Sequence, residues 1–330
     1  MSDKIRWGVL STAGIAQHEV IPAMKRADNA EVVAISSLSG RAQEVAEQLD
    51  IEKAYDSYHE VLDDPDIDAV YIPLPNHLHK EWAIRAANKK KHILLEKPIA
   101  LTSQDVHEIK QAVIENGVIF MEAFMYYFHP QHHRVKELIK EGAIGEVKQF
   151  EASFTFHLND RDSNIRMDRT LGGGSLYDVG CYTIHAMRHI LDEEPITVKT
   201  EAIKDEKTGI DTTTVSYFTF ASGKTAVVTS SFDQFGRDNY HVYGTDGHIH
   251  VPRAFRPDTR GGEGLVVLDQ GFKTSTESFH NDLYRDEVEH ISYSILNDQE
   301  PLLTFKHSYN NMKAIDAALR SIETGETEEI

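Results

Sequence analysis

The stretch that decides the fold spans residues 91 to 98 and reads Lys91-His92-Ile93-Leu94-Leu95-Glu96-Lys97-Pro98. Its apolar run, 93–95, is typical of a strand covered on both faces of a parallel sheet. Pro98 has no N–H for a sheet ladder and restricts the residue before it, so the strand should end here. Ligands of open α/β sheets bind beyond the carboxyl ends of the strands, which makes Lys97 a candidate site residue. On this stretch alone, a surface lysine is the simpler interpretation.

Around this stretch, strands and helices alternate along residues 1–123. We expect strands at 5–10, 31–35, 67–72, 118–121 and in the run that ends at Leu95, with helices at 15–27, 40–49, 77–88 and from near Thr102. Repeated strand–helix units of this length predict an α/β domain with a parallel sheet and helices on both faces.

From Glu146 onward the pattern changes. Strands are expected at 147–158, 212–220 and 225–232, with a turn at 221–224 and late helices at 281–296 and 308–324. This pattern predicts a second, α+β domain over residues 124–330, built on a large, mostly antiparallel open sheet. An open face of such a sheet usually needs cover, so we expect a homodimer or homotetramer formed through it.

Composition narrows the classes of function. The chain has 330 residues, 40% of them apolar, and a formal net charge of −19, which disfavours nucleic acid and anionic membranes as partners. No apolar run approaches the ~20 residues that span a bilayer, and no signal peptide precedes the first strand, so we expect a cytoplasmic protein. Cys181 is the only cysteine, which excludes an internal disulfide. The acidic end, 323–330, is expected to be a solvated tail.

The turn after the first strand is the expected place for a dinucleotide pyrophosphate, because backbone N–H groups at a helix start bind phosphates. The residues that align with the fingerprint G-x-G-x-x-G/A are Ser11-Thr12-Ala13-Gly14-Ile15-Ala16. Small residues replace both leading glycines, and Ala16 fits the last position. The match is weak by itself, and an ordinary strand-to-helix turn is the alternative.

The segment after the second strand bears on the choice of cofactor. An acid about 20 residues after the fingerprint would accept the 2′-OH of NAD. After Ile35 the chain has no acid before Glu44 and offers Ser37 and Arg41 instead. Hydroxyl and guanidinium groups suit the 2′-phosphate of NADP better, so NADP is preferred and NAD is the alternative. Arg41 fits equally well as a solvated helix residue.

Polar residues follow the strand that ends at Ile72. Asn76 can cap the next helix or reach the ribose or carboxamide of the cofactor. His77 and His79 fit a partly exposed helix face, and their spacing matches no recognised zinc motif, so no metal is expected.

A helix after the three glycines 172–174 places Asp178, Tyr182 and His185 on one face. The segment 175–178 fits a capping box with Asp178 at its third helical position, which explains Asp178 structurally. Tyr182 fits an interface aromatic, and His185 is more simply structural.

Together these residues resemble the Gfo/Idh/MocA family of nicotinamide-dependent oxidoreductases. The resemblance covers essentially the whole chain, and its carriers are the turn 11–16, Leu74-Pro75-Asn76, Glu96-Lys97-Pro98, Glu122-Ala123-Phe124 and the segment from Gly172 to Tyr182. Within the family the chain looks most like the branch of glucose–fructose oxidoreductase, dihydrodiol dehydrogenase and xylose dehydrogenases. The resemblance implies an N-terminal Rossmann domain and a sugar, polyol or diol substrate.

The resemblance also implies roles for individual residues. Lys97 is expected to contact substrate near the nicotinamide, with a cis bond to Pro98, and Asp178 and Tyr182 are expected to face it. Besides the turn, Ser37 and Arg41, the candidate cofactor-binding residues are Leu74, Pro75, Asn76, His79, Glu96, Lys97, Glu122 and Arg166. Tyr284 is a weaker candidate.

Hydride transfer to or from a carbinol carbon also needs a general acid–base group. Lys97 and Tyr182 are both candidates, and the sequence does not decide between them. We prefer Tyr182 as the acid–base, Lys97 polarising the reacting oxygen and Asp178 orienting the pair.

Three functions stay open at this stage. The leading one is an NADP-linked dehydrogenase or reductase acting on a sugar, polyol or related hydroxy compound. The others are a non-catalytic nucleotide-binding sensor and a redox-neutral enzyme that keeps its cofactor tightly bound. The presence of Lys97, Asp178 and Tyr182 favours an enzyme.

Overall fold

The computed structural model describes residues 4–330, which form two compact units. Unit 1 runs to Phe128 and takes up the chain again at Tyr284–Tyr309, whereas unit 2 comprises His129–Leu283 and Asn310–Ile330. The sequence predicts the division after residue 123 and does not predict the return of 284–309 to unit 1. An amphipathic helix fits the face of either sheet, so its periodicity does not reveal which sheet it covers.

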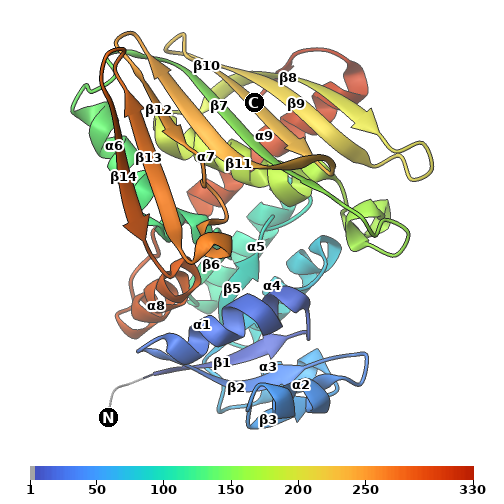
Figure 1. The fold of residues 1–330 in the computed structure, drawn as a ribbon. Helices are drawn as coiled ribbons and strands as arrows, with labels where there is room; N and C mark the ends of the chain where they lie inside the picture. Colours follow the sequence, from blue (N-terminus) through green and yellow to red (C-terminus); the bar gives the residue numbers. More distant parts are fainter. Residues whose placement is uncertain (1–3) are drawn as a thin grey trace. The chain divides into compact units, whose positions relative to one another are not determined.

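Unit 1 contains a six-stranded parallel sheet with the order β3-β2-β1-β4-β5-β6 (Figure 1). Its strands are β1 Ile5–Leu10, β2 Ala30–Ser36, β3 Lys53–Tyr55, β4 Ala69–Ile72, β5 His92–Glu96 and β6 Phe120–Ala123. The order reverses between β1 and β4, which is the point where such sheets bind ligands. The predicted Rossmann sheet is therefore confirmed, although β3 was not predicted.

Helices α1 to α5 pack against this sheet, and α8 joins them. Their bounds are α1 Ile21–Arg26, α2 Ala42–Gln48, α3 Tyr58–Asp63, α4 His79–Asn88, α5 Ser103–Asn116 and α8 Leu283–Leu296, with the short helices η1 Ala16–Val20, η2 Asn76–Leu78 and η3 Met125–Phe128. Local sequence sets the ends of α5. Thr102 caps it by accepting the Asp105 N–H at 3.1 Å, and Gly117 ends it with a φ of 63°.

Two close contacts fix the core of unit 1. A Cβ at Gly8 of β1 would lie 2.6 Å from Val61 of α3, so glycine is what lets this helix approach the strand. On α8, the Ser292 hydroxyl accepts the indole N–H of the buried Trp7 at 3.2 Å. The Trp7–Ser292 hydrogen bond links α8, within residues 284–309, to the same sheet that the first 128 residues form.

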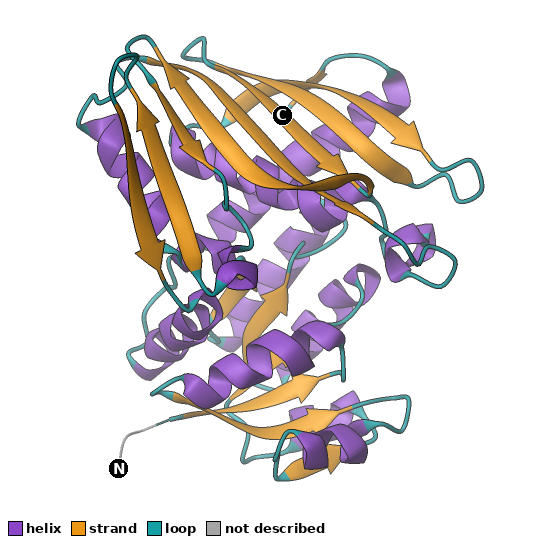
Figure 2. Ribbon diagram, in the orientation of Figure 1, coloured by secondary structure: helices purple, strands orange, loops and turns teal. Residues whose placement is uncertain are grey.

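Unit 2 contains a nine-stranded sheet with the order β14-β13-β12-β11-β7-β10-β9-β8-β15 (Figure 2). The strands are β7 Val147–His157, β8 Pro195–Lys204, β9 Asp211–Phe220, β10 Thr225–Ser231, β11 Asp233–Gly244, β12 His248–Val251, β13 Glu263–Asp269, β14 Thr274–His280 and β15 Glu328–Glu329. Only the β7–β10 pair is parallel among these described strands, which confirms the prediction of a mostly antiparallel sheet.

The helices of unit 2 cover one face of this sheet. They are α6 Pro130–Lys140, α7 Cys181–Leu191 and, from Asn310 onward, α9 Phe305–Thr324, with the short helices η4 Ile165–Met167, η5 Arg169–Leu171, η6 Leu176–Gly180 and η7 Pro257–Arg260. Along β9, Phe218 points into the covered face and is fully buried. Val215 and Tyr217 point the other way and are 44% and 45% exposed.

The C-terminus corrects one prediction. Residues 323–330 are not a solvated tail, because Glu328 and Glu329 form β15 and pair with β8. The N–H of Ile330 continues the pairing to the carbonyl of Ile196 at 3.1 Å. Backbone ladders do not require apolar side chains, so the acidic composition gave no sign of this edge strand.

Two further sequence predictions can be compared with the fold. The side chain of Cys181 is a buried free thiol. Over residues 4–330, no helix combines the length and apolarity needed to cross a membrane.

Candidate functional site

The carboxyl end of β1 leads into the turn of residues 11–16. Ser11 has a φ of 136°, in a region that glycine normally occupies. The Gln17 side-chain amide donates to the carbonyl of Thr12 at 2.6 Å and steadies the turn. A Cβ at Gly14 would meet only His18, at 3.8 Å, so the space in front of this turn is open. The turn thus has the accessible backbone that a pyrophosphate needs.

Hydroxyl groups gather at the end of β2. The Ser37 hydroxyl lies 3.3 Å from that of Thr12 and 2.9 Å from that of Ser39. Arg41 is exposed, and its Nε is 3.8 Å from Glu44, a separation at which an exposed ion pair contributes little. Residues 36–43 contain no acid, as the sequence indicates.

His79 connects the loops that follow β4 and β5. Its two ring nitrogens lie 2.7 Å from the carbonyl oxygen of Leu74 and 2.8 Å from that of Pro98. Burial lowers the pKa of His79 to about 4, while both carbonyls oppose the shift by stabilising the charged ring. The sequence places His79 on a partly exposed helix face, and this is wrong because the residue is fully buried. The ring therefore holds the two loops together, and a role of His79 in binding the cofactor stays a prediction.

Glu96 ends β5 and is held by the neighbouring strand β4. The hydroxyl of Tyr71 donates to Glu96 Oε1 at 2.5 Å, and Oε2 of Glu96 accepts the backbone N–H of Lys97 at 3.3 Å. Burial, followed by the charge of Glu96, raises the pKa of Tyr71 well above its usual value, so the phenol keeps the proton that it donates. Lys97 follows this fixed carboxylate and is partly exposed.

Strand β6 holds the other side of the same loop. The buried carboxylate of Glu122 accepts the backbone N–H of Ile99 at 2.8 Å. The Lys97–Pro98 peptide bond is cis, as the resemblance implies. The ends of three parallel strands, β4, β5 and β6, therefore converge on the segment that carries Lys97.

In unit 2, Arg166 and Asp178 form an ion pair. The guanidinium Nε donates to Asp178 Oδ2 at 2.6 Å, and its carbon lies 5.8 Å from the ring centre of Phe156. The charge of Asp178 is the main cause that raises the pKa of Arg166, and Tyr182 adds to it. The structure thus brings together Arg166, Asp178 and Tyr182, three residues that the sequence singles out.

Aromatic packing fixes the ring of Tyr182. The ring centre lies 5.4 Å from that of Phe154 and 5.9 Å from that of Phe255. Asp238 holds the Phe255 loop by accepting the N–H of Phe255 at 2.6 Å. Burial raises the pKa of Asp238 to about 6. Tyr182 itself is 5% exposed, so its hydroxyl has a defined position.

The helix start before Asp178 differs from the predicted capping box. Ser175 is already helical and makes no side-chain cap. Its hydroxyl donates to Asp211 at 3.0 Å, and the Leu176 N–H donates to the same oxygen at 2.8 Å. Gly174 has a φ of 124°, and a Cβ there would lie 2.4 Å from Asp211. A buried carboxylate from β9 therefore anchors the helix, and Asp178 is left to pair with Arg166.

Tyr71 and Asp211 are supporting residues that sequence reasoning missed. Tyr71 lies in a buried apolar strand and resembles an ordinary core aromatic. Asp211 begins β9, and the helix that it anchors starts 35 residues earlier. No local pattern connects residues so far apart in sequence.

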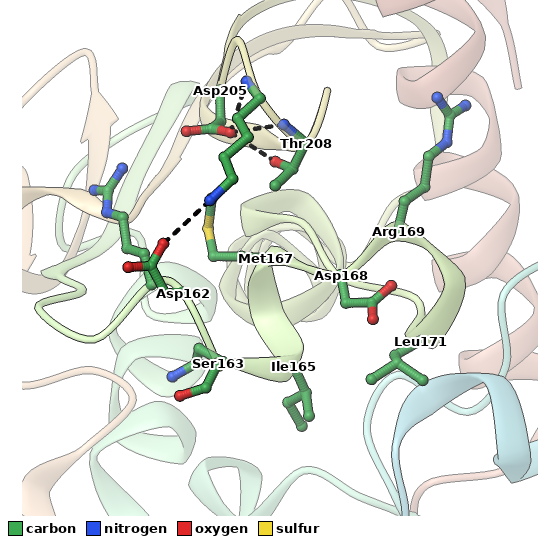
Figure 3. A pocket seen from close by; sticks show the side chains of 12 residues that line it. Asp162, Ser163, Ile165, Met167, Asp168, Arg169, Leu171, Asp205 and Thr208 are labelled. Carbon is green, nitrogen blue, oxygen red and sulfur yellow. Dashed lines mark hydrogen bonds and ion pairs between the residues drawn. The ribbon is translucent and has the colours of Figure 1, made fainter.

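A pocket of about 460 Å³ lies in unit 2 between segments 161–171 and 205–208 (Figure 3). Asp205 and Asp168 line it, but their carboxylates cap their own loops through Thr208 and Thr170. These bonds explain the shape of the loops and do not by themselves indicate a ligand.

Asp211 gives a prediction about stability. Burial raises its pKa to about 6, whereas aspartate in an unfolded chain titrates near ~3.9. The native state therefore holds the proton more tightly, and the free energy of unfolding should fall by about 3 kcal/mol as the pH rises from about 4 to above 6. Asp211→Asn removes this titration. Its stability difference from wild type in urea unfolding should therefore change by that amount over this pH range.

The control for this prediction is Asp162→Asn, because the Asp162 side chain is 92% exposed. Its difference from wild type should stay constant with pH. A constant difference for Asp211→Asn as well would contradict the prediction.

Comparison with known proteins assigns the chain to a family. Residues 5–124 match a model described as oxidoreductase family, NAD-binding Rossmann fold, and residues 132–250 match the GFO/IDH/MocA C-terminal domain. The D-xylose 1-dehydrogenase (NADP(+)) 2 of Haloferax volcanii is 37% identical over 98% of this chain and 99% of its own. A 3-ketoreductase of Actinomadura kijaniata, solved with NADP and TDP-benzene, is 29% identical with a TM-score of 0.92 over 97% of this chain and 98% of its own. The chain therefore belongs to the Gfo/Idh/MocA family of oxidoreductases.

Proposed function

We propose that the protein is an NADP-linked oxidoreductase that transfers hydride between the nicotinamide and a CH–OH group of a sugar, polyol or diol. The observation that carries the proposal is the setting of Lys97. It follows Glu96 at the carboxyl end of β5, and hydrogen bonds from β4 and β6 fix the segment around it. A lysine placed only for solubility would not need this support.

The residues of unit 1 fit a dinucleotide. The open turn at Gly14 suits the pyrophosphate, and the hydroxyls of Thr12 and Ser37 suit the ribose or its 2′-phosphate. Arg41 supplies an accessible cation for that phosphate. We assign the remaining candidates, Leu74, Pro75 and Asn76, to the loop beside the nicotinamide end.

The cofactor supplies the hydride acceptor or donor, and the chain's own residues handle the proton. We propose that Lys97 polarises the reacting oxygen while Tyr182 exchanges the hydroxyl proton. A cation beside a phenol stabilises its deprotonated form, and we propose this role for Arg166, whose charge interacts with that of Tyr182. Asp178 orients Arg166 through their hydrogen bond of 2.6 Å. Arg166 is thus a positioning group for the acid–base.

The names of relatives guide the choice of substrate. They include a D-xylose 1-dehydrogenase and, in Xenopus laevis, a trans-1,2-dihydrobenzene-1,2-diol dehydrogenase that is 28% identical. The two compounds in these names, D-xylose and a 1,2-diol, both carry hydroxyl groups on neighbouring carbons. A screen of aldoses, polyols and vicinal diols with both cofactors, followed at the absorbance of the reduced nicotinamide, tests this proposal. Failure of every substrate with both cofactors would contradict it.

The cofactor proposal predicts tighter binding of NADPH than of NADH. Arg41→Ala should reduce the ratio of the two dissociation constants by about tenfold or more, since a hydrogen bond to a charged group contributes about 1.5–3 kcal/mol. Arg85→Ala is the control, because Arg85 pairs with Glu81 on α4. Fluorescence titration measures both constants. Equal affinities in the wild type would rule out the proposed preference, and an unchanged ratio in Arg41→Ala would exclude Arg41 as its cause.

The roles proposed for Lys97 and Tyr182 predict that substituting either residue lowers turnover. Lys97→Met should remove most turnover and leave NADPH affinity nearly unchanged, because a cation at the reacting oxygen acts mainly in the transition state. Tyr182→Phe should lower kcat by about 10²–10⁴-fold. The losses should not multiply in the double variant, because both groups serve one proton transfer.

Lys80→Met is the matched control, since Lys80 pairs with Asp105 and Glu108. Near-normal kcat in Tyr182→Phe would make the tyrosine a binding residue and Lys97 the acid–base. Near-normal kcat in Lys97→Met as well would refute the oxidoreductase proposal and favour a nucleotide-binding sensor.

We also expect self-association through the open face of the nine-stranded sheet, where Val215 and Tyr217 are exposed. Light scattering at micromolar concentration should report a mass of at least twice 37.3 kDa. Tyr217→Glu should lower it, because association would bury the new charge. Ile114→Glu, on an exposed position of α5, should have no effect. A single monomeric species in the wild type would contradict this expectation.

A further inference from the structure

A buried carboxyl group of α8 lies in the core of unit 1 without a hydrogen bond. Glu287 is 1% exposed, and neither oxygen of its carboxyl group has a partner among residues 4–330. An ionised carboxylate in such surroundings is strongly disfavoured, because no donor replaces the water that it loses. Glu287 therefore holds its proton in the folded protein.

The charged group that acts on Glu287 is Glu96. Burial first, and then the charge of Glu96, raise the pKa of Glu287 well above its usual value. The other titratable groups of this cluster are Tyr71 of β4 and Tyr284 of α8 itself. Two carboxyl groups that interact in a buried site titrate as a pair and do not ionise together.

The pair is connected to the lysine segment. Glu96 accepts the hydroxyl of Tyr71 through one oxygen and the backbone N–H of Lys97 through the other. Glu96, whose charge acts on Glu287, is thus the group that holds the end of β5. If Glu287 ionised, a second negative charge would be added next to a lysine that has to act on a reacting oxygen.

A purely structural role explains Glu287 poorly. A leucine or methionine would fill a similar volume without burying an unbonded polar group. Unsatisfied buried groups and carboxyls with strongly raised pKa values concentrate at functional sites. The chain keeps such a group beside the glutamate that precedes Lys97.

We propose that Glu287 stays a neutral, protonated carboxyl group and thereby limits the charge beside Lys97 to the one carboxylate of Glu96. Glu287 is then a positioning residue that acts through Glu96 and sets the pH range of turnover. This inference rests on the function proposed above and deepens it.

The protonation of Glu287 can be tested without any activity. Infrared spectra of the full chain at pH 8 should contain the carbonyl band of a protonated carboxylic acid, and Glu287→Gln should lose it. Glu289→Gln is the matched control, because Glu289 lies on the same helix, is partly exposed and accepts the Asp28 N–H. Absence of the band from the wild type, or its survival in Glu287→Gln, would overturn the proposal.

The proposed effect of Glu287 on the pH range of turnover is tested by a second measurement. The kcat of the wild type should show an alkaline inflection where Glu287 ionises, and Glu287→Gln, which stays neutral, should lose this inflection. Glu289→Gln should keep it. The pH dependence of NADPH affinity gives the same comparison if no substrate turns over. Absence of turnover would contradict the proposed function, whereas the pH dependence of NADPH affinity would still test the role of Glu287. Superimposable profiles of wild type and Glu287→Gln would make Glu287 a structural acid only and overturn the proposal.

Discussion

The hydrogen bond from Tyr71 to Glu96 joins the ends of β4 and β5, and the site of unit 1 depends on it. Parallel strands end at the same edge of a sheet, but this alone does not hold a loop in one conformation. The 2.5 Å bond from the neighbouring strand fixes the carboxylate, and that carboxylate fixes the start of the lysine segment. Glu122 of β6 and His79 of α4 hold the residues that follow. These bonds thereby hold the backbone on both sides of Lys97, whose side chain is partly exposed.

In unit 2, too, a buried carboxylate holds the segment that carries candidate residues. Asp211 anchors a helix start, and Asp178 is then available to bind Arg166. Two helices begin with a π-helical turn, η1 after the dinucleotide turn and η6 before Tyr182. Such turns are often found at functional sites. In each unit, a residue far away in the sequence holds the segment that carries the candidates: Tyr71 holds Glu96 in unit 1, and Asp211 holds the helix start in unit 2.

The sequence predicts a feature of the structure when the residues that form it lie close together along the chain. Continuous apolar strands and their breaks are local, so the parallel sheet and the place of Lys97 at a strand end could be predicted. Residues 25 positions apart form the Tyr71–Glu96 bond, and Ser175 and Asp211 are 36 positions apart. Such partners are fixed only when the sheets assemble. The capping box at Ser175 failed for this reason, because a distant carboxylate took the place of the local cap.

Burial is the second property that the sequence hides. His79 and Glu287 are polar residues on helices, and their types indicate exposed positions, yet both lie in the core. The properties of such residues depend on their neighbours in the fold. For Glu287, one such neighbour is the carboxylate of Glu96, whose charge raises its pKa. The supporting groups of the candidate site were therefore the part that could not be predicted. Lys97, Asp178 and Tyr182 are candidates through the family resemblance, and their roles stay predictions.

We propose that a hydride moves between a carbinol carbon of the substrate and the nicotinamide. The most direct test supplies NADP⁺ and aldoses deuterated at the carbon that is to be oxidised, D-xylose first, and measures the mass of the reduced cofactor. One deuterium per turnover should appear in the nicotinamide ring. Turnover that yields product while leaving the cofactor unlabelled, or no turnover with any deuterated aldose, polyol or diol, would contradict it.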